Sequence, residues 1–405
     1  MKRSHILKTI LTLLLCLAVL FSMAACGDKS ASPKDDSENG DPSTTTPDST
    51  GDTENDDTVY KFALMAPLTG NNAQYGQTYQ TTLELLLDKV NSSGGINGHQ
   101  VSLDIYDDKN DPKESVNIAT KIADDPDILG VVGSQISSCS MAAAPIFQEK
   151  NILMVSPQAS HVDFTSIGDC IFRTQVTTAH ENAETAKFLV NDLGAKKVGF
   201  IYSSDDWGVS MLETMTAALE DLGSEVVAAE TYIAGETKDF TPLISKIKQA
   251  EPDVLFLASV YADAVQIIQQ CKNLNLDVPY VGSNTLFKQE FIDVGGEDVE
   301  GVMMCNTVQL NNNNEEYLWL EEAYKEKTGN FTDSYVTQSY DALNVMLKAL
   351  EEVGPDRDAM KNYLANLTDY VGVSGTFSFD EYRNPAKTVY IYQIQDGAIV
   401  ELPRK

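Results

Sequence analysis

Serine residues follow two short apolar runs in one stretch of the chain, and their placement could create an anion-binding site. The stretch covers residues 131–160 and reads VVGSQISSCSMAAAPIFQEKNILMVSPQAS. Ser137 and Ser138 stand where a helix should begin, and the free backbone N–H groups of a helix N-terminus attract an anion. Serine is also a common helix cap, and spacing alone leaves the anion site and the cap equally open.

The residues around these serines predict the elements that would position them. A β-branched run ends at Gly133, an Ala-rich segment follows, and a second apolar run extends from Ile152 to Val155. Strand, loop, helix, strand, loop is the unit that builds parallel sheets. Because ligands bind beyond the carboxyl ends of such strands, we expect the two serine-containing loops to lie side by side at a cleft.

Composition excludes several classes of function. The chain has 405 residues, enough for two domains, and 42% of them are hydrophobic. A formal net charge of −31 argues against nucleic acid as a partner. The four histidines show no metal-ligand spacing, so no metal or other cofactor is expected. Cys139 and Cys170 flank one strand–helix–strand stretch and could form a disulfide, although buried free thiols are the commoner outcome.

The first 58 residues predict a membrane-anchored secretory protein. Residues 1–25 have a basic start and an apolar core over 10–21, typical of a signal peptide. The following Met23-Ala24-Ala25-Cys26-Gly27 resembles a bacterial lipobox, so we expect Cys26 to be lipidated; cleavage without lipidation is the alternative. Residues 26–58 are acidic and lack core-forming residues, which predicts a disordered tether.

From Val59 onward, predicted strands and helices alternate in two tandem series, which indicates an α/β fold. Strands are expected at 60–66, 101–106, 131–133, 152–155, 198–202, 225–232, 254–258, 278–282 and 301–308. Helices are expected in every interval between these strands except the last, among them 113–124, 241–250 and 263–274, and again from Glu315 and Ser334. No GxGxxG, GxxxxGK[ST] or GxSxG motif occurs at a strand-to-helix turn, so the sequence does not support nucleotide binding or a nucleophile elbow.

Several motifs together resemble the leucine/isoleucine/valine-binding proteins, which are type I periplasmic solute receptors of ABC importers. They are NSSGGING at 91–98, Asp107-Asp108, Asp111-Pro112 and the 131–160 stretch, in the family's order. The resemblance runs from about Val59 to the C-terminus. It implies two doubly wound parallel-sheet lobes joined by a three-crossing hinge, the first from 59–176 plus 309–378 and the second from 177–308 plus 379–405.

The resemblance also implies a ligand site. It assigns ligand contacts to Tyr75, Ser137, Ser138, Gln158, Ala159, Ser160, Trp207, Tyr261, Asn284 and Tyr335. Tyr75 and Trp207 are both expected in loops that follow strands. Ser137 and Ser160 would hold the ligand carboxylate, and the Gln158 carbonyl would accept a hydrogen bond from its ammonium. The family's acidic partner for that ammonium falls on the uncharged Asn284, and Asp206 or Asp263 could supply the missing charge.

The expected function is therefore that of a lipid-anchored, extracytoplasmic receptor. It would bind a small amino acid, branched-chain or otherwise apolar, between its lobes and deliver it as a monomer to a permease and ATPase complex. A receptor or sensor for a small carboxylate or amide without an α-amino group is the first alternative. The second is an extracellular α/β hydrolase using Ser137 or Asp205, although the chain lacks a nucleophile paired with a base.

Overall fold

The computed structural model describes residues 58–70, 72–310 and 312–403. The predicted signal peptide and Cys26 lie outside these residues, as does all of the predicted tether except its last position. Within the described part of the chain, no helix has both the length and the apolar character needed to cross a membrane.

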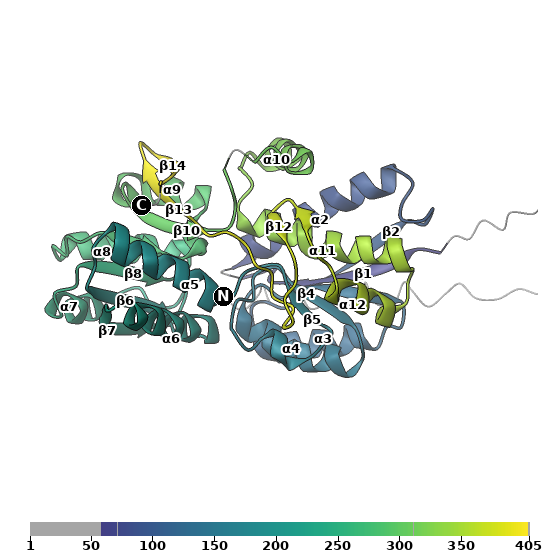
Figure 1. The fold of residues 1–405 in the computed structure, drawn as a ribbon, viewed down its shortest axis with the longest axis horizontal. Coiled ribbons are helices and arrows are strands. Elements are labelled where there is room, and N and C mark those ends of the chain that lie inside the picture. The colour runs from purple at the N-terminus through teal and green to yellow at the C-terminus, as the bar shows by residue number, and fades with distance from the viewer. Residues whose placement is uncertain (1–57, 71, 311, 404–405) are drawn as a thin grey trace, which may run out of the picture. The chain divides into compact units, whose positions relative to one another are not determined.

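A five-stranded parallel sheet forms the frame of what we call the first lobe (Figure 1). Its strands are β1 (Tyr60–Ala66), β2 (Val101–Asp107), β3 (Ile128–Gly133), β4 (Leu153–Ser156) and β5 (Ile171–Arg173). They lie in the order β2-β1-β3-β4-β5, and every neighbouring pair is parallel. All five carboxyl ends therefore meet at one edge of the sheet.

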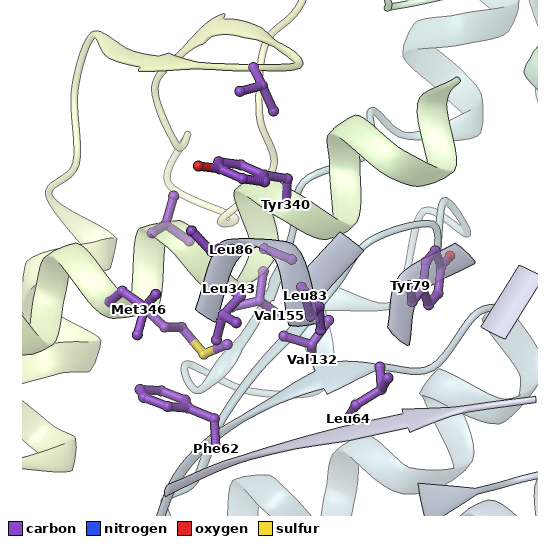
Figure 2. Close-up of a cluster of buried hydrophobic side chains, with 14 of the residues drawn as sticks. Phe62, Leu64, Tyr79, Leu83, Leu86, Val132, Val155, Tyr340, Leu343 and Met346 are labelled. Atoms are coloured by element: carbon purple, nitrogen blue, oxygen red, sulfur yellow. The ribbon is translucent and has the colours of Figure 1, made fainter. Parts of the chain in front are cut away.

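Helices cover both faces of this sheet because its strands are apolar on both sides. The helices of this lobe are α2 (Ala73–Ser92), α3 (Pro112–Ala123), α4 (Ser137–Glu149), α10 (Glu315–Thr328), α11 (Ser334–Val353) and α12 (Arg357–Ala365). Along β1, Phe62 and Leu64 join the layer under α2 and α11, whereas Ala63 and Met65 join the layer under α3 and α4. Figure 2 shows the first layer, with side chains from α2 and α11 packed over the sheet.

The second lobe is built on a seven-stranded mixed sheet of order β14-β13-β10-β9-β8-β6-β7. Its strands are β6 (Lys197–Ser203), β7 (Glu225–Tyr232), β8 (Val254–Ala258), β9 (Tyr280–Gly282), β10 (Met303–Asn306), β13 (Tyr390–Gln395) and β14 (Ala398–Glu401). β6 to β10 are parallel, and β13 is antiparallel to β10. The predicted α/β fold with two parallel-sheet lobes is confirmed.

The helices of the second lobe also lie on both faces of its sheet. They are α5 (Thr178–Lys187), α6 (Asp206–Asp221), α7 (Thr241–Gln249), α8 (Tyr261–Asn273) and α9 (Gln289–Gly295), with a π-helical turn at Phe188–Asp192 and a 3-10 turn at Asn284–Leu286. In β8, Leu255 and Leu257 pack with α7 and α8, whereas Phe256 packs with α5 and α6. Because successive side chains of a strand point to opposite faces of the sheet, β8 contributes to the hydrophobic core on each face.

Three connections join the lobes, and one buried lysine holds all three. They run over 174–177, 307–314 and 378–389, between β5 and α5, β10 and α10, and β12 (Gly375–Phe377) and β13. Lys387, in the third connection, donates to the Thr174 carbonyl at 2.6 Å, to Gln338 Oε1 at 2.7 Å and to Ser374 Oγ at 2.6 Å. Gln338 in turn donates to Thr307 Oγ1 at 3.0 Å, which brings in the second connection.

Most predicted elements occur, with differences at their ends. The helix expected from 263 begins at Tyr261, and the strand expected over 301–308 is confined to Met303–Asn306. The short strand β5, the helices α9 and α12, and the β12 hairpin with β11 (Tyr370–Gly372) were not expected from the sequence. Cys139 and Cys170 are buried free thiols, so the open question of a disulfide between them is resolved against one.

Candidate functional site

A cavity lies where the carboxyl ends of the two sheets face each other. The empty space between its lining residues, including its opening to solvent, amounts to about 470 Å³. Its lining comes from both lobes: Gln135, Ile136, Ser137, Gln158, Ser160, Ser203, Asp205, Trp207, Ala234, Val260, Asn284, Thr285 and Tyr335. The edge of the sheets is where ligands of parallel α/β folds bind.

The N-terminus of α4 opens at this cavity without a side-chain cap. Its N-cap residue is Ile136, which cannot accept a hydrogen bond through its side chain. The Ser137 hydroxyl is used elsewhere, because it accepts a hydrogen bond from the His161 N–H at 3.3 Å. The interpretation of Ser137 and Ser138 as helix caps is therefore wrong, and the first N–H groups of the helix remain available to an anion.

Buried hydroxyl groups hold the two serine-containing loops together. Ser156 Oγ donates to the Ser134 carbonyl at 3.0 Å and accepts from the Ala159 N–H at 3.0 Å. Ser140 Oγ donates to the same Ser134 carbonyl at 3.2 Å, so the loop after β3 is fixed from both sides. Ser160, itself 3% exposed, ends the second loop beside Ser137. These bonds preorganise the two serines that the sequence predicted as carboxylate contacts.

The second lobe contributes an acidic group and an aromatic face. Asp205 caps α6 by accepting from the Gly208 N–H at 2.9 Å, and it also accepts from the Ser203 hydroxyl at 2.9 Å. Burial raises the pKa of Asp205, and these hydrogen bonds partly oppose the shift. The turn is tight, because a Cβ on Gly208 would lie 2.0 Å from the Ser203 carbonyl oxygen. It leaves Trp207 half-buried against the cavity.

A second acidic group lies directly behind Asn284. Glu181 Oε1 accepts from the Asn284 N–H at 3.4 Å and from the Cys305 thiol at 3.1 Å. Burial raises the pKa of Glu181 to about 7. The Asn284 side chain donates to Gln158 Oε1 at 3.4 Å, across the boundary between the lobes. Asn284 therefore connects a buried carboxyl group in the second lobe with a cavity residue of the first.

An ion pair also joins the lobes beside the cavity. Lys288, which precedes α9, bonds to Asp333, the N-cap of α11, and both residues are buried. The Lys288 ammonium lies 5.3 Å from the ring centre of Tyr75 and 4.7 Å from that of Tyr335. Burial acts to lower the pKa of Lys288, but the attraction of Asp333 and Glu290 outweighs it and leaves the pKa raised.

The structure brings six of the ten predicted contact residues to the cavity. These six are Ser137, Gln158, Ser160, Trp207, Asn284 and Tyr335. The other four, Tyr75, Ser138, Ala159 and Tyr261, are not part of its lining. Tyr75 was expected in a loop, but it lies in the first turn of α2, fully buried behind Tyr335 at a ring distance of 4.6 Å.

Several lining residues were not predicted as ligand contacts. They are Gln135, Ile136, Ser203, Asp205, Ala234, Val260 and Thr285. Small and apolar residues in loops give no pattern of their own in a sequence, and only their position after a strand could have indicated them. Asp206 and Asp263, the suggested sources of negative charge, do not line the cavity; Asp205 does.

The arrangement favours binding over chemistry. One end of the cavity offers helix N–H groups and hydroxyls for an anion, and the rest offers Ile136, Trp207, Val260 and Tyr335 as apolar surface. Among the described residues, no group of three or more His, Cys, Asp or Glu side chains could hold a metal ion. A small ligand with one anionic group and an apolar body fits these features.

Comparison with known proteins gives consistent results. The family model for periplasmic binding proteins matches residues 59–398. The leucine-, isoleucine-, valine-, threonine- and alanine-binding protein of Pseudomonas aeruginosa is 28% identical over 338 residues, covering 82% of this chain and 90% of that protein. A crystal structure of a leucine-binding protein from Thermotoga maritima superimposes with a TM-score of 0.80 at 24% identity, covering 85% of this chain and 97% of that one. A solute-binding protein of R. palustris in complex with benzoate gives 0.78 at 20% identity, covering 85% and 96%.

Proposed function

Because this chain belongs to the periplasmic binding protein family, we propose that it is the extracytoplasmic substrate-binding protein of an ABC importer for branched-chain or other apolar amino acids. The family is one of binding proteins rather than enzymes, so the ligand is released unchanged. The relative from Pseudomonas aeruginosa, matched over 90% of its length, is named for binding such amino acids.

One observation carries this proposal: the uncapped N-terminus of α4 opens beside Ser160 in a cavity that is otherwise largely apolar. The ligand carboxylate would take the α4 N–H groups and the hydroxyls of Ser137 and Ser160. The apolar side chain would lie against Trp207 and Tyr335. A helix N-terminus favours a carboxylate through both its free donors and its dipole.

A carboxylate without an α-amino group is the second candidate, favoured because the one acidic residue of the cavity lining is already engaged within the protein. Asp205 is the one acidic residue in the lining, and its carboxylate already caps α6 and accepts from Ser203. Asn284 stands where the family's acidic partner for the ligand ammonium would be. The same fold holds benzoate in the R. palustris protein, so the architecture accepts a ligand that has no amine.

Calorimetry with matched ligand pairs tests the proposal and separates the two candidates. Leucine and phenylalanine are titrated beside 4-methylpentanoate and 3-phenylpropanoate, which keep the carboxylate and lose the amine. We expect the amino acids to bind more tightly. Ser160→Ala should weaken binding about tenfold or more, because a hydrogen bond to a charged group contributes about 1.5–3 kcal/mol.

Ser166→Ala is the matched control for Ser160→Ala. The Ser166 hydroxyl is exposed and donates to the Asp163 carbonyl, away from the cavity lining. Its loss should leave every affinity unchanged. If the deaminated acids bind as tightly as the amino acids, the second candidate replaces the first. If no carboxylate binds, the proposed function fails.

We further propose that the mature protein is held to the outer face of the membrane by lipid on Cys26. The basic and apolar leader and the lipobox-like sequence at 23–27 support this proposal. The acidic stretch that follows would then separate the anchor from the binding lobes, and so give them room to reach a permease.

A further inference from the structure

Arg173 is a fully buried cation at the carboxyl end of β5, on the side of the sheet where the cavity opens. Its side chain is 0% exposed and is among the largest fully buried side chains of the described residues. Nη1 donates to the Ala159 carbonyl at 2.9 Å and to the His161 carbonyl at 2.8 Å. These two residues flank Ser160, so the guanidinium lies beneath the loop that carries it.

The same loop is tied to the second serine of the anion site. The His161 N–H donates to Ser137 Oγ at 3.3 Å, while the His161 carbonyl accepts from Arg173. One residue therefore contacts the guanidinium on one side and the start of α4 on the other. Consecutive Cα atoms are about 3.8 Å apart, so the charge of Arg173 lies within a residue or two of both serines.

No carboxylate of the described residues lies within ion-pair distance of this cation, and Asp380 and Asp163 attract it only from farther away. Its remaining contacts are Thr165 Oγ1 at 3.4 Å and the ring of Phe164 at 5.3 Å. The Nε–H group is buried and makes no hydrogen bond. Burial lowers the pKa of Arg173 to about 9, which still leaves the guanidinium charged at neutral pH. Burial thus outweighs the attraction of Asp380 and Asp163, and a buried charge without a close counter-ion is costly for a fold to keep.

We propose that Arg173 is a specificity-determining residue whose buried positive charge selects ligands that carry a carboxylate. This inference rests on the proposed function, because it assigns to the ligand the close negative charge that the described residues do not place beside Arg173. A carboxylate held by Ser137 and Ser160 would lie several ångströms from the guanidinium, separated from it by the 159–161 backbone. A neutral ligand of the same shape would gain the hydrogen bonds but not this attraction.

The attraction is large enough to measure. At an effective dielectric constant near 20, unit charges about 7 Å apart change affinity by about tenfold or more. The charge also acts without touching the ligand, since the contacts of Nη1 are backbone carbonyls. Arg173 therefore has two separable effects. It positions the loop through its donors, and it favours anions through its charge.

Acid and amide pairs separate these effects. Affinities are measured for leucine against leucinamide and for 4-methylpentanoate against 4-methylpentanamide, in the native chain, R173K and R173Q. The melting temperature is also measured in formate and in formamide at constant ionic strength. These two compounds differ in charge and carry no side chain, so the comparison does not depend on knowing the ligand. The control is R357Q: Arg357 also donates to backbone carbonyls, those of Pro126 and Ile128, but at the start of β3, away from the cavity.

We expect R173Q to reduce the acid-over-amide preference about tenfold or more and to abolish the extra stabilisation by formate. R173K should bind more weakly but keep most of the preference, because it keeps the charge. R357Q should keep both the acid-over-amide preference and the extra stabilisation by formate. The inference is overturned if R173Q keeps the acid-over-amide preference. It is also overturned if R173K loses that preference, and this result decides the question even if R173Q does not fold. If neither ligand pair binds the native chain, the proposed function fails, and formate stabilisation still decides the role of Arg173.

Discussion

At the scale of single residues, the unusual feature of the site is a buried carboxyl group behind an amide. Glu181 is 3% exposed and lies against the backbone of Asn284. Its hydrogen-bond partners are an N–H and a thiol, and neither carries a positive charge. Its ionisation should therefore be opposed by the fold and should appear in the pH dependence of stability.

Glu181→Gln tests this. Burial raises the pKa of Glu181 from 4.5 to about 7 in the folded chain, so the folded state binds the proton more tightly than the unfolded state. Its contribution to stability is complete below pH 4.5 and is lost as the pH rises through 7. The variant should match the native chain at pH 4.5 and be more stable at pH 8, by up to about 3 kcal/mol. Urea unfolding across this range measures the difference.

Glu220→Gln provides the comparison for this pH series, because Glu220 is exposed on α6. Its stability curve should run parallel to that of the native chain at every pH. Parallel curves for Glu181→Gln as well would mean that Glu181 is no harder to ionise in the fold than in the unfolded chain.

Residue patterns predicted part of the site and could not predict the rest. Ser137 and Ser160 follow strands and match a family motif, and both line the cavity. Thr285 and Ala234 also follow strands, but they belong to the other lobe, and their role depends on how two separate sheets face each other. The burial of Arg173 beneath the 159–161 loop is equally invisible in the sequence, because it depends on which groups surround the side chain in three dimensions.

At the scale of elements, the start of α11 does two things at once. One oxygen of Asp333 caps the helix by accepting from the N–H groups of Tyr335 at 2.8 Å and Val336 at 3.0 Å. The other oxygen bonds to Lys288 of the second lobe. The end of one helix is thus a point of attachment between the lobes, directly beside the cavity residue Tyr335.

Asp333→Asn should separate these roles, because asparagine is also a good N-cap but carries no charge. Lys288 would then be buried without its main partner, and an unpaired charge that stays buried destabilises a fold by about 3–5 kcal/mol. Opening of the lobes would expose Lys288 to water and so avoid this cost. We therefore expect a lower melting temperature and, by small-angle X-ray scattering, a larger radius of gyration in the ligand-free protein.

A second substitution should reverse this effect. Adding Lys288→Met to Asp333→Asn removes the unpaired charge, so the radius of gyration should return toward the native value. Asp356→Asn is the matched cap control, since Asp356 caps α12 by accepting from the Ala359 N–H at 2.8 Å. An unchanged radius in the Asp333 variant would show that the ion pair does not hold the lobes together.

The errors in predicted elements have physical causes. Strand β5 has three residues, too few for a period to appear, and it ends in an arginine that normally signals a surface. Tyr75 was expected in a loop because the preceding segment, Pro67 to Gly70, has turn composition. Helix α2 begins soon afterwards and turns that ring into the core. Long elements with clear periodicity, such as α11 and β7, were predicted at their observed starts.

At the scale of the whole molecule, the proposed anchor makes a prediction about where the protein is found. Cys26→Ser should remove the site of lipid attachment, so that the chain either is released to the medium or keeps its leader. Cell fractionation and the mass of the mature N-terminus distinguish these outcomes. Cys16→Ser, within the leader itself, should leave the distribution unchanged. A Cys26 variant that fractionates like the native chain would contradict the anchor.

The lysine that holds the three connections has a mechanical consequence. Because Lys387 binds the first connection at Thr174 and reaches the second through Gln338 and Thr307, the three segments cannot bend independently. Relative rotation of the lobes should then bend all three connections together, about the point where Lys387 links them. Ligand binding in the cavity would thereby change the distance between the outer surfaces of the two lobes. A transporter that touches only those surfaces can read whether a ligand is present without any contact with the ligand.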